Sequence, residues 1–145
     1  MLFDRSAGPA IAVAVTFVWL GMVLAISFVE TPLKFRAPNV TLPIGLGIGR
    51  LVFRALNTVE VGFALVILAI VVTGTTPARI AAAFSVAFTA LAIQLIAVRP
   101  RLTRRSDQML AGLDAPRSRG HHAYVFLEVV KVAALAVTGI LLLAA

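Results

Sequence analysis

Four apolar runs, each 21 or 22 residues long, dominate this chain of 145 residues. An α-helix needs about 20 apolar residues to cross a hydrocarbon core roughly 30 Å thick, so each run has the length of one membrane span. The strands of a membrane barrel would instead appear as alternating segments of about ten residues. The sequence therefore predicts an all-α integral membrane protein, a single domain that forms an up-down bundle of four transmembrane helices. The expected spans are residues 9–29, 51–72, 78–98 and 123–144, with loops at 30–50 and 99–122.

The boundaries of these spans have local causes in the sequence. Pro32 and Pro100 follow the first and third runs, and the residue before a proline is disfavoured in helical geometry. We therefore expect the first and third helices to end at these prolines. Only residues 73–77 connect the second and third runs, which predicts that these two helices pack as an antiparallel hairpin.

The composition agrees with a membrane protein and excludes several other classes. Hydrophobic residues make up 61% of the chain and charged residues 13%, whereas a soluble domain averages roughly 25% charged residues. The net charge of +7 could indicate a nucleic-acid partner, but the basic residues form neither a helix face nor an aromatic platform, so none is expected. The chain contains no cysteine, which excludes disulfides, thiolate metal ligands and cysteine nucleophiles. The first run is longer than the roughly 7–15 apolar residues of a signal peptide, so we expect it to be retained.

Lysine and arginine are distributed unequally between the two sides of the expected bundle. Residues 30–54 carry four of them and residues 99–122 carry six, whereas the opposite side carries only Arg5 and Arg79. Cytoplasmic loops carry an excess of these residues. The sequence therefore predicts a multi-pass protein of the cell (inner or cytoplasmic) membrane, with both long loops in the cytoplasm and both termini on the outer side.

Ionisable residues within spans are informative, because each costs about 2.5–3.5 kcal/mol at the centre of a membrane helix. With a rise of 1.5 Å per residue, Glu60 and Lys131 both lie about 12–13 Å from the cytoplasmic ends of their spans. We therefore expect an interhelical ion pair between them, with Glu128 held by Asn57, Gln94 or Arg54. The expected intramembrane polar cluster, in the cytoplasmic half, consists of Asn57, Glu60, Gln94, Glu128 and Lys131.

Other polar residues follow the same faces. Tyr124 and His121 share a stripe with Glu128 and Lys131 on the fourth span, and Trp19 belongs to a weaker polar line on the first. Two interpretations of the cluster remain open. It is either structural, orienting helices that have little hydrophobic driving force of their own, or it is a proton, ion or ligand site that opens to the cytoplasm.

Gly45, Gly47 and Gly49 form a Gly-x-Gly-x-Gly run before the second span. A phosphate-binding fingerprint of this kind requires a preceding strand and a βαβ unit, and neither is expected here. A flexible or re-entrant loop is the better interpretation.

The remaining candidates lie at the interface between membrane and cytoplasm. His121 and His122 are interpreted as residues near lipid headgroups, since a metal site that joined them to Glu128 and Glu60 would lack the Glu-x-x-His spacing of di-metal bundles. No cofactor, metal or catalytic residue is expected. Basic residues near a membrane surface attract anionic lipid by about 1 kcal/mol each. Either this attraction or topology signalling alone explains the basic cluster, which consists of Arg101, Arg104 and Arg105.

Several segments, taken in order, resemble a family of small four-helix membrane proteins that includes eukaryotic transmembrane protein 205, and short membrane proteins of actinobacteria. The matching segments are Trp19-Leu-Gly, Phe28-Val-Glu-Thr-Pro-Leu-Lys-Phe35, Gly49-Arg-Leu-Val-Phe53, Arg99-Pro-Arg-Leu102 and His122. The resemblance covers most of the chain. It implies the four-span fold and no established activity.

Two classes of function fit these observations, and neither is enzymatic. In the first, the protein is a non-catalytic membrane module in the lipid bilayer that binds other membrane proteins or self-associates. In the second, it is a small oligomeric transporter or channel that uses the Glu/Lys cluster. The first is preferred on the sequence, because no span shows the interruption typical of transport helices.

Overall fold

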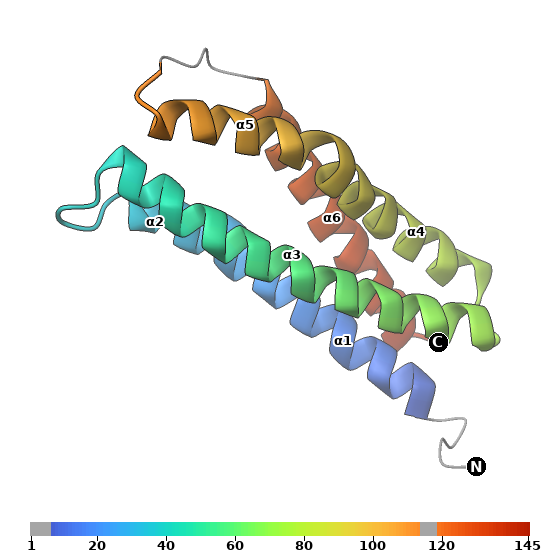
Figure 1. Cartoon of the computed structure of the whole chain (residues 1–145). Coiled ribbons are helices and arrows are strands. Elements are labelled where there is room, and N and C mark those ends of the chain that lie inside the picture. The colour runs from blue at the N-terminus through green and yellow to red at the C-terminus, as the bar shows by residue number, and fades with distance from the viewer. Residues whose placement is uncertain (1–6, 114–118) are drawn as a thin grey trace.

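A computed structural model of the chain describes residues 7–113 and 119–145. The chain forms four long helical segments (Figure 1). All four are long and apolar enough to cross a membrane: Ala7–Lys34, Leu42–Thr73, Ala78–Leu110 and Gly120–Leu143. The described residues contain no strand. The predicted all-helical fold with four candidate spans is therefore confirmed.

Two of the four segments are compound helices. In chain order the elements are α1 (Ala7–Val23), η1 (Leu24–Glu30), α2 (Thr31–Lys34), α3 (Leu42–Thr73), α4 (Ala78–Ile93), η2 (Gln94–Val98), α5 (Arg99–Leu110) and α6 (Gly120–Leu143). The elements η1 and η2 are π-helical, so their hydrogen bonds join residues five apart instead of four. The first segment is thus α1–η1–α2 and the third is α4–η2–α5.

The segments run alternately up and down, and the start of α1 lies at the same end as the end of α6 (Figure 1). We call the opposite end, which carries Lys34, Arg50, Arg99 and Arg105, the basic end. Helix α6 packs against α1 and α4, and α1 also packs against α3. Helices α3 and α4 make few backbone contacts despite their short connection. The prediction that these two helices pack as an antiparallel hairpin is therefore wrong: they are antiparallel, but α4 packs mainly against α6.

Pro32 and Pro100 do not end their helices. Pro32 lies in α2 directly after η1, and Pro100 lies in α5 directly after η2, so each helix continues through its proline. A proline inside a helix lacks an N–H, and its ring clashes with the carbonyl four residues before it. The wider π-helical turn before each proline accommodates both effects. The predicted loops at 30–50 and 99–122 are consequently helical over much of their length.

The glycine-rich stretch is likewise helical and not a flexible or re-entrant loop. It forms the first turns of α3, where the side chain of Thr41 accepts a hydrogen bond from the amide of Ile44 at 3.5 Å. Gly45 and Gly49 are buried four residues apart, and a β-carbon at either position would collide with Phe35 or Lys34. These glycines therefore leave room for the side chains of Phe35 and Lys34 against the start of α3.

An apolar core fills the bundle between its middle and the end at which α1 begins. It draws on all four segments and consists of Trp19, Val23, Ala64, Ile67, Phe84, Ala87, Leu91, Ala134 and Leu135. Trp19, Ala87 and Leu135 have no exposed surface. This core borders a buried group of charged side chains on its basic side.

Candidate functional site

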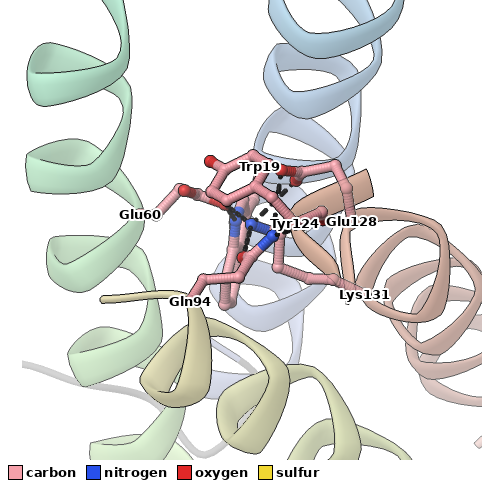
Figure 2. Close-up of polar contacts among 6 residues, drawn as sticks. All are labelled: Trp19, Glu60, Gln94, Tyr124, Glu128 and Lys131. Atoms are coloured by element: carbon pink, nitrogen blue, oxygen red, sulfur yellow. Dashed lines mark hydrogen bonds and ion pairs between the residues drawn. The ribbon is translucent and has the colours of Figure 1, made fainter. Parts of the chain in front are cut away.

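The side chain of Lys131 lies at the centre of the buried polar cluster (Figure 2). Its Nζ lies 2.5 Å from Glu60 Oε1 and 2.8 Å from Glu128 Oε1. It also donates a hydrogen bond to Gln94 Oε1 at 2.9 Å. An ammonium has three protons to donate, and three oxygens surround this one. The ion pair expected between Glu60 and Lys131 is thus present in the structure.

Two neutral side chains hold the carboxylates in place. Trp19 Nε1 donates to Glu60 Oε1 at 2.9 Å. Gln94 Nε2 donates to Glu128 Oε2 at 3.1 Å and to the backbone carbonyl of Tyr124 at 3.3 Å. Trp19 comes from α1, Glu60 from α3 and Gln94 from η2. Glu128 and Lys131 come from α6, so the cluster joins all four segments.

The cluster is almost entirely buried, and its charges do not balance. Glu60 and Lys131 have 0% exposure and Glu128 has 1%. Two carboxylates here face one ammonium, which leaves one negative charge in excess if every group is ionised. An uncompensated charge in the interior costs several kcal/mol, and a buried group usually changes its protonation state instead. Glu60 Oε2 has no hydrogen-bond partner in the described part of the chain.

The other residues considered for this cluster lie at its margin. Asn57 is buried one turn before Glu60, and its Oδ1 has no hydrogen-bond partner among the described residues. Arg54 is exposed. Of the three side chains considered as partners of Glu128, the structure therefore brings Gln94 to it. Tyr124 is buried and packs edge-on against the ring of Phe53, with 5.7 Å between the ring centroids.

A cavity of about 400 Å³ lies between the cluster and the basic end. Its walls come from η1, α2, α3, α5 and α6, and it reaches Tyr124 and Glu128. The volume is within the range of about 300–1,000 Å³ that small-molecule sites occupy. The cavity therefore extends from the basic end to Glu128, a residue of the cluster.

Basic side chains line this cavity together with aromatic ones. Lys34 lies 3.6 Å from Glu30, and Arg50 lies 2.5 Å from Asp107. Arg99 donates to the backbone carbonyl of Arg50 at 3.4 Å, and its guanidinium lies 5.6 Å from the ring centroid of Phe53. Arg99 and Arg105 form no ion pair within residues 7–113 and 119–145.

The residues expected near lipid headgroups separate into two groups. Arg105 and His121 line the cavity, whereas Arg101, Arg104 and His122 are exposed and do not. The two histidine rings contact each other, with 6.0 Å between their centroids. No three histidine or acidic residues of the described segments are grouped as metal ligands. Only part of the expected interfacial set therefore belongs to the site.

Sequence reasoning did not include Trp19 or Arg99 in the site. The polar line on the first span contains Trp19, but a tryptophan in a membrane helix is more often an interfacial anchor than a donor to a buried carboxylate. Arg99 was counted only as a loop charge. Its place next to Pro100 at the end of an apolar run was the available signal.

No family model, no curated protein and no solved structure matches this chain. The resemblance to the transmembrane protein 205 family therefore stays a prediction.

Proposed function

We propose that the protein is a small multi-pass membrane transporter that binds a solute in the cavity and takes up a proton at the cluster of Glu60, Glu128 and Lys131. The observation that supports this function most is the reach of the cavity. It extends from the basic end to Glu128, whose carboxylate belongs to a cluster with one excess negative charge. A solute in the cavity would thus lie beside a residue of this charged cluster.

The excess charge favours a proton at this site. Lys131 on α6 contacts both carboxylates, and Tyr124 lies one turn before Glu128 on the same helix; α1 and η2 contribute the neutral Trp19 and Gln94. One proton shared by Glu60 and Glu128 would leave the cluster neutral. Buried carboxylates that pair with a lysine are common parts of proton pathways in transporters.

The cavity opens on one side of the cluster only. On the other side, the apolar core around Trp19, Phe84 and Leu135 closes the bundle. This arrangement corresponds to one of the two states of an alternating-access transporter. The π-helical segments η1 and η2 lie at the cavity and the cluster, where the sequence showed no interruption, and π-helical turns frequently occur at functional sites.

The orientation follows from the positive-inside rule. The basic end would face the cytoplasm, both termini would lie outside, and the cavity would open to the cytoplasm. The membrane would be the cell membrane of the source organism. A homo-oligomer remains part of this proposal, since four helices alone enclose little volume.

A second candidate is the non-catalytic membrane module that binds other membrane proteins or copies of itself. One observation favours it: the cluster satisfies most of its own polar atoms and joins all four segments. Such a cluster would stabilise a scaffold without any change of charge.

Reconstitution in liposomes that contain a pH-sensitive dye separates the two candidates. A pH gradient is imposed, and solutes of different classes (anionic, cationic, neutral and amphiphilic) are added from outside. We expect at least one class to accelerate dissipation of the gradient with the wild type. A variant that carries Glu60→Gln, Glu128→Gln and Lys131→Met together, and that reconstitutes equally well, should show no acceleration. Equal rates for the two proteins with every class would contradict transport and favour the scaffold.

A further inference from the structure

Two arginines on the cavity wall have charges that the described residues do not neutralise. Lys34 and Arg50 each have a carboxylate within ion-pair distance. Arg99 and Arg105 line the same cavity without one in the described segments, and the Nε of Arg105 is buried with no hydrogen-bond partner. A planar guanidinium forms paired hydrogen bonds with phosphate and carboxylate groups. The wall therefore has unused donors suited to an anion.

The remainder of the cavity is mainly apolar. Phe28, Phe35, Leu46, Phe53 and Leu102 contribute to its walls. A hydrated inorganic anion would leave these side chains without a partner. An amphiphile places a charged head and a hydrocarbon chain at the same site, so it matches both parts of the lining.

We propose that the cavity binds an anionic phospholipid of the surrounding bilayer, with its phosphate at Arg99 and Arg105 and an acyl chain along the phenylalanine rings. This inference deepens the proposed function, on which it rests for the assumption that the cavity is the substrate site. A lipid bound in the cavity can be distinguished from lipid attracted to the outer surface of the helix, because α5 carries arginines in both places. Arg99 and Arg105 line the cavity, while Arg101 and Arg104 are exposed outside it.

Native mass spectrometry of the full chain in a non-ionic detergent tests the proposal. Palmitoyl lysophosphatidic acid is the probe, palmitoyl lysophosphatidylcholine is the control with the same chain and a zwitterionic head, and inorganic phosphate is the control without a chain. We expect one lysophosphatidic acid per protein chain, bound about tenfold or more tightly than lysophosphatidylcholine, as charged hydrogen bonds imply. Inorganic phosphate should not compete.

Matched arginine variants locate the bound lipid. Arg99→Gln with Arg105→Gln should weaken binding of lysophosphatidic acid by about tenfold or more. Arg101→Gln with Arg104→Gln removes the same charge from the same helix and should leave the affinity within about twofold, as expected for exposed charges. Because Arg99 also packs on Phe53, Arg105→Gln is measured alone as well, and it should still weaken binding by about threefold or more.

Three results would overturn the proposal: equal affinity for both lysolipids, equal loss in both double variants, or competition by inorganic phosphate at similar affinity. None of these measurements depends on proton movement. Lipid binding without dissipation of a pH gradient by any solute would contradict transport but not the lipid site. Dissipation by another solute class without lipid binding would contradict the lipid site but not transport.

Discussion

Lys131 is the residue on which the buried cluster depends, because its ammonium contacts oxygens from α3, η2 and α6. Removing it leaves two carboxylates without a cation in a region that has almost no exposed surface. Truncating one partner of a buried ion pair is far more costly than neutralising both partners. The cluster should therefore respond very differently to single and double substitutions.

Lys131→Met should lower the free energy of unfolding by about 3–5 kcal/mol, since it leaves Glu60 and Glu128 unpaired. Adding Glu60→Gln should restore part of this loss, with a coupling of about 0.5–3 kcal/mol. Arg50→Gln is the control, because the side chains of Arg50 and its partner Asp107 are 30% and 59% exposed, so its loss should cost about 1 kcal/mol or less. Unfolding in mixed micelles is measured for the wild type, Lys131→Met, Glu60→Gln, the double variant and the control variant. Additive effects of Lys131→Met and Glu60→Gln would contradict the pairing.

Depth and charge sufficed to predict the pair of Glu60 and Lys131 from sequence, because an unpaired charge in a membrane helix is costly. The same argument could not choose among three partners for Glu128, since helix rotation decides which side chain reaches it. The structure brings Gln94 there. The contact of Trp19 with Glu60 depends on how α1 and α3 are rotated, which residue spacing alone does not give.

At the scale of elements, the junctions η1–α2 and η2–α5 extend the helices beyond their expected ends. The sequence rule that helices end before proline failed at Pro32 and Pro100, because a π-helical turn precedes each of them. Helix extension carries Lys34 and Arg105 to the cavity. Of the two site residues that the sequence analysis missed, Arg99 belongs to such an extension, whereas Trp19 lies in α1 and does not.

The start of α3 offers a matched pair of glycine substitutions. A β-carbon at position 47 meets no atom within 4 Å, whereas one at position 45 collides with the ring of Phe35 on the cavity wall. Alanine is favoured over glycine in a helix by about 1 kcal/mol, so Gly47→Ala should raise the thermal midpoint. Gly45→Ala should raise it less or lower it, and should weaken binding of lysophosphatidic acid. Equal effects of the two substitutions on the thermal midpoint and on lipid binding would contradict the packing of the Phe35 ring against the start of α3.

At the scale of the whole molecule, the number and alternation of the helices could be predicted because four apolar runs of span length leave few other arrangements. The pairs of helices that pack against each other could not be predicted in this way. Helices α3 and α4 are joined by a short turn, yet α4 packs mainly on α6. The shared core, to which all four segments contribute, lies between α3 and α4 and α6, and residue spacing alone does not give this arrangement.

The orientation of the bundle can be tested directly, because the chain contains no cysteine. Thr75, in the α3–α4 turn, and Gln108, in α5, are exposed at opposite ends of the molecule. A membrane-impermeant thiol reagent applied to intact cells should label Thr75→Cys and should leave Gln108→Cys unlabelled until the membrane is opened. The reverse pattern would place the basic end and its cavity outside the cell.

We propose that Glu60 and Glu128, which both contact the ammonium of Lys131, share one proton. Infrared spectroscopy of the purified protein at neutral pH tests it, because a protonated carboxyl group has a carbonyl band that a carboxylate lacks. The account predicts one such buried group in the wild type, none in Glu60→Gln or Glu128→Gln, and two in Lys131→Met. Glu30→Gln, which removes a partly exposed carboxylate, should leave the band unchanged. A wild type without the band, or a band that none of the three cluster substitutions alters, would contradict the account.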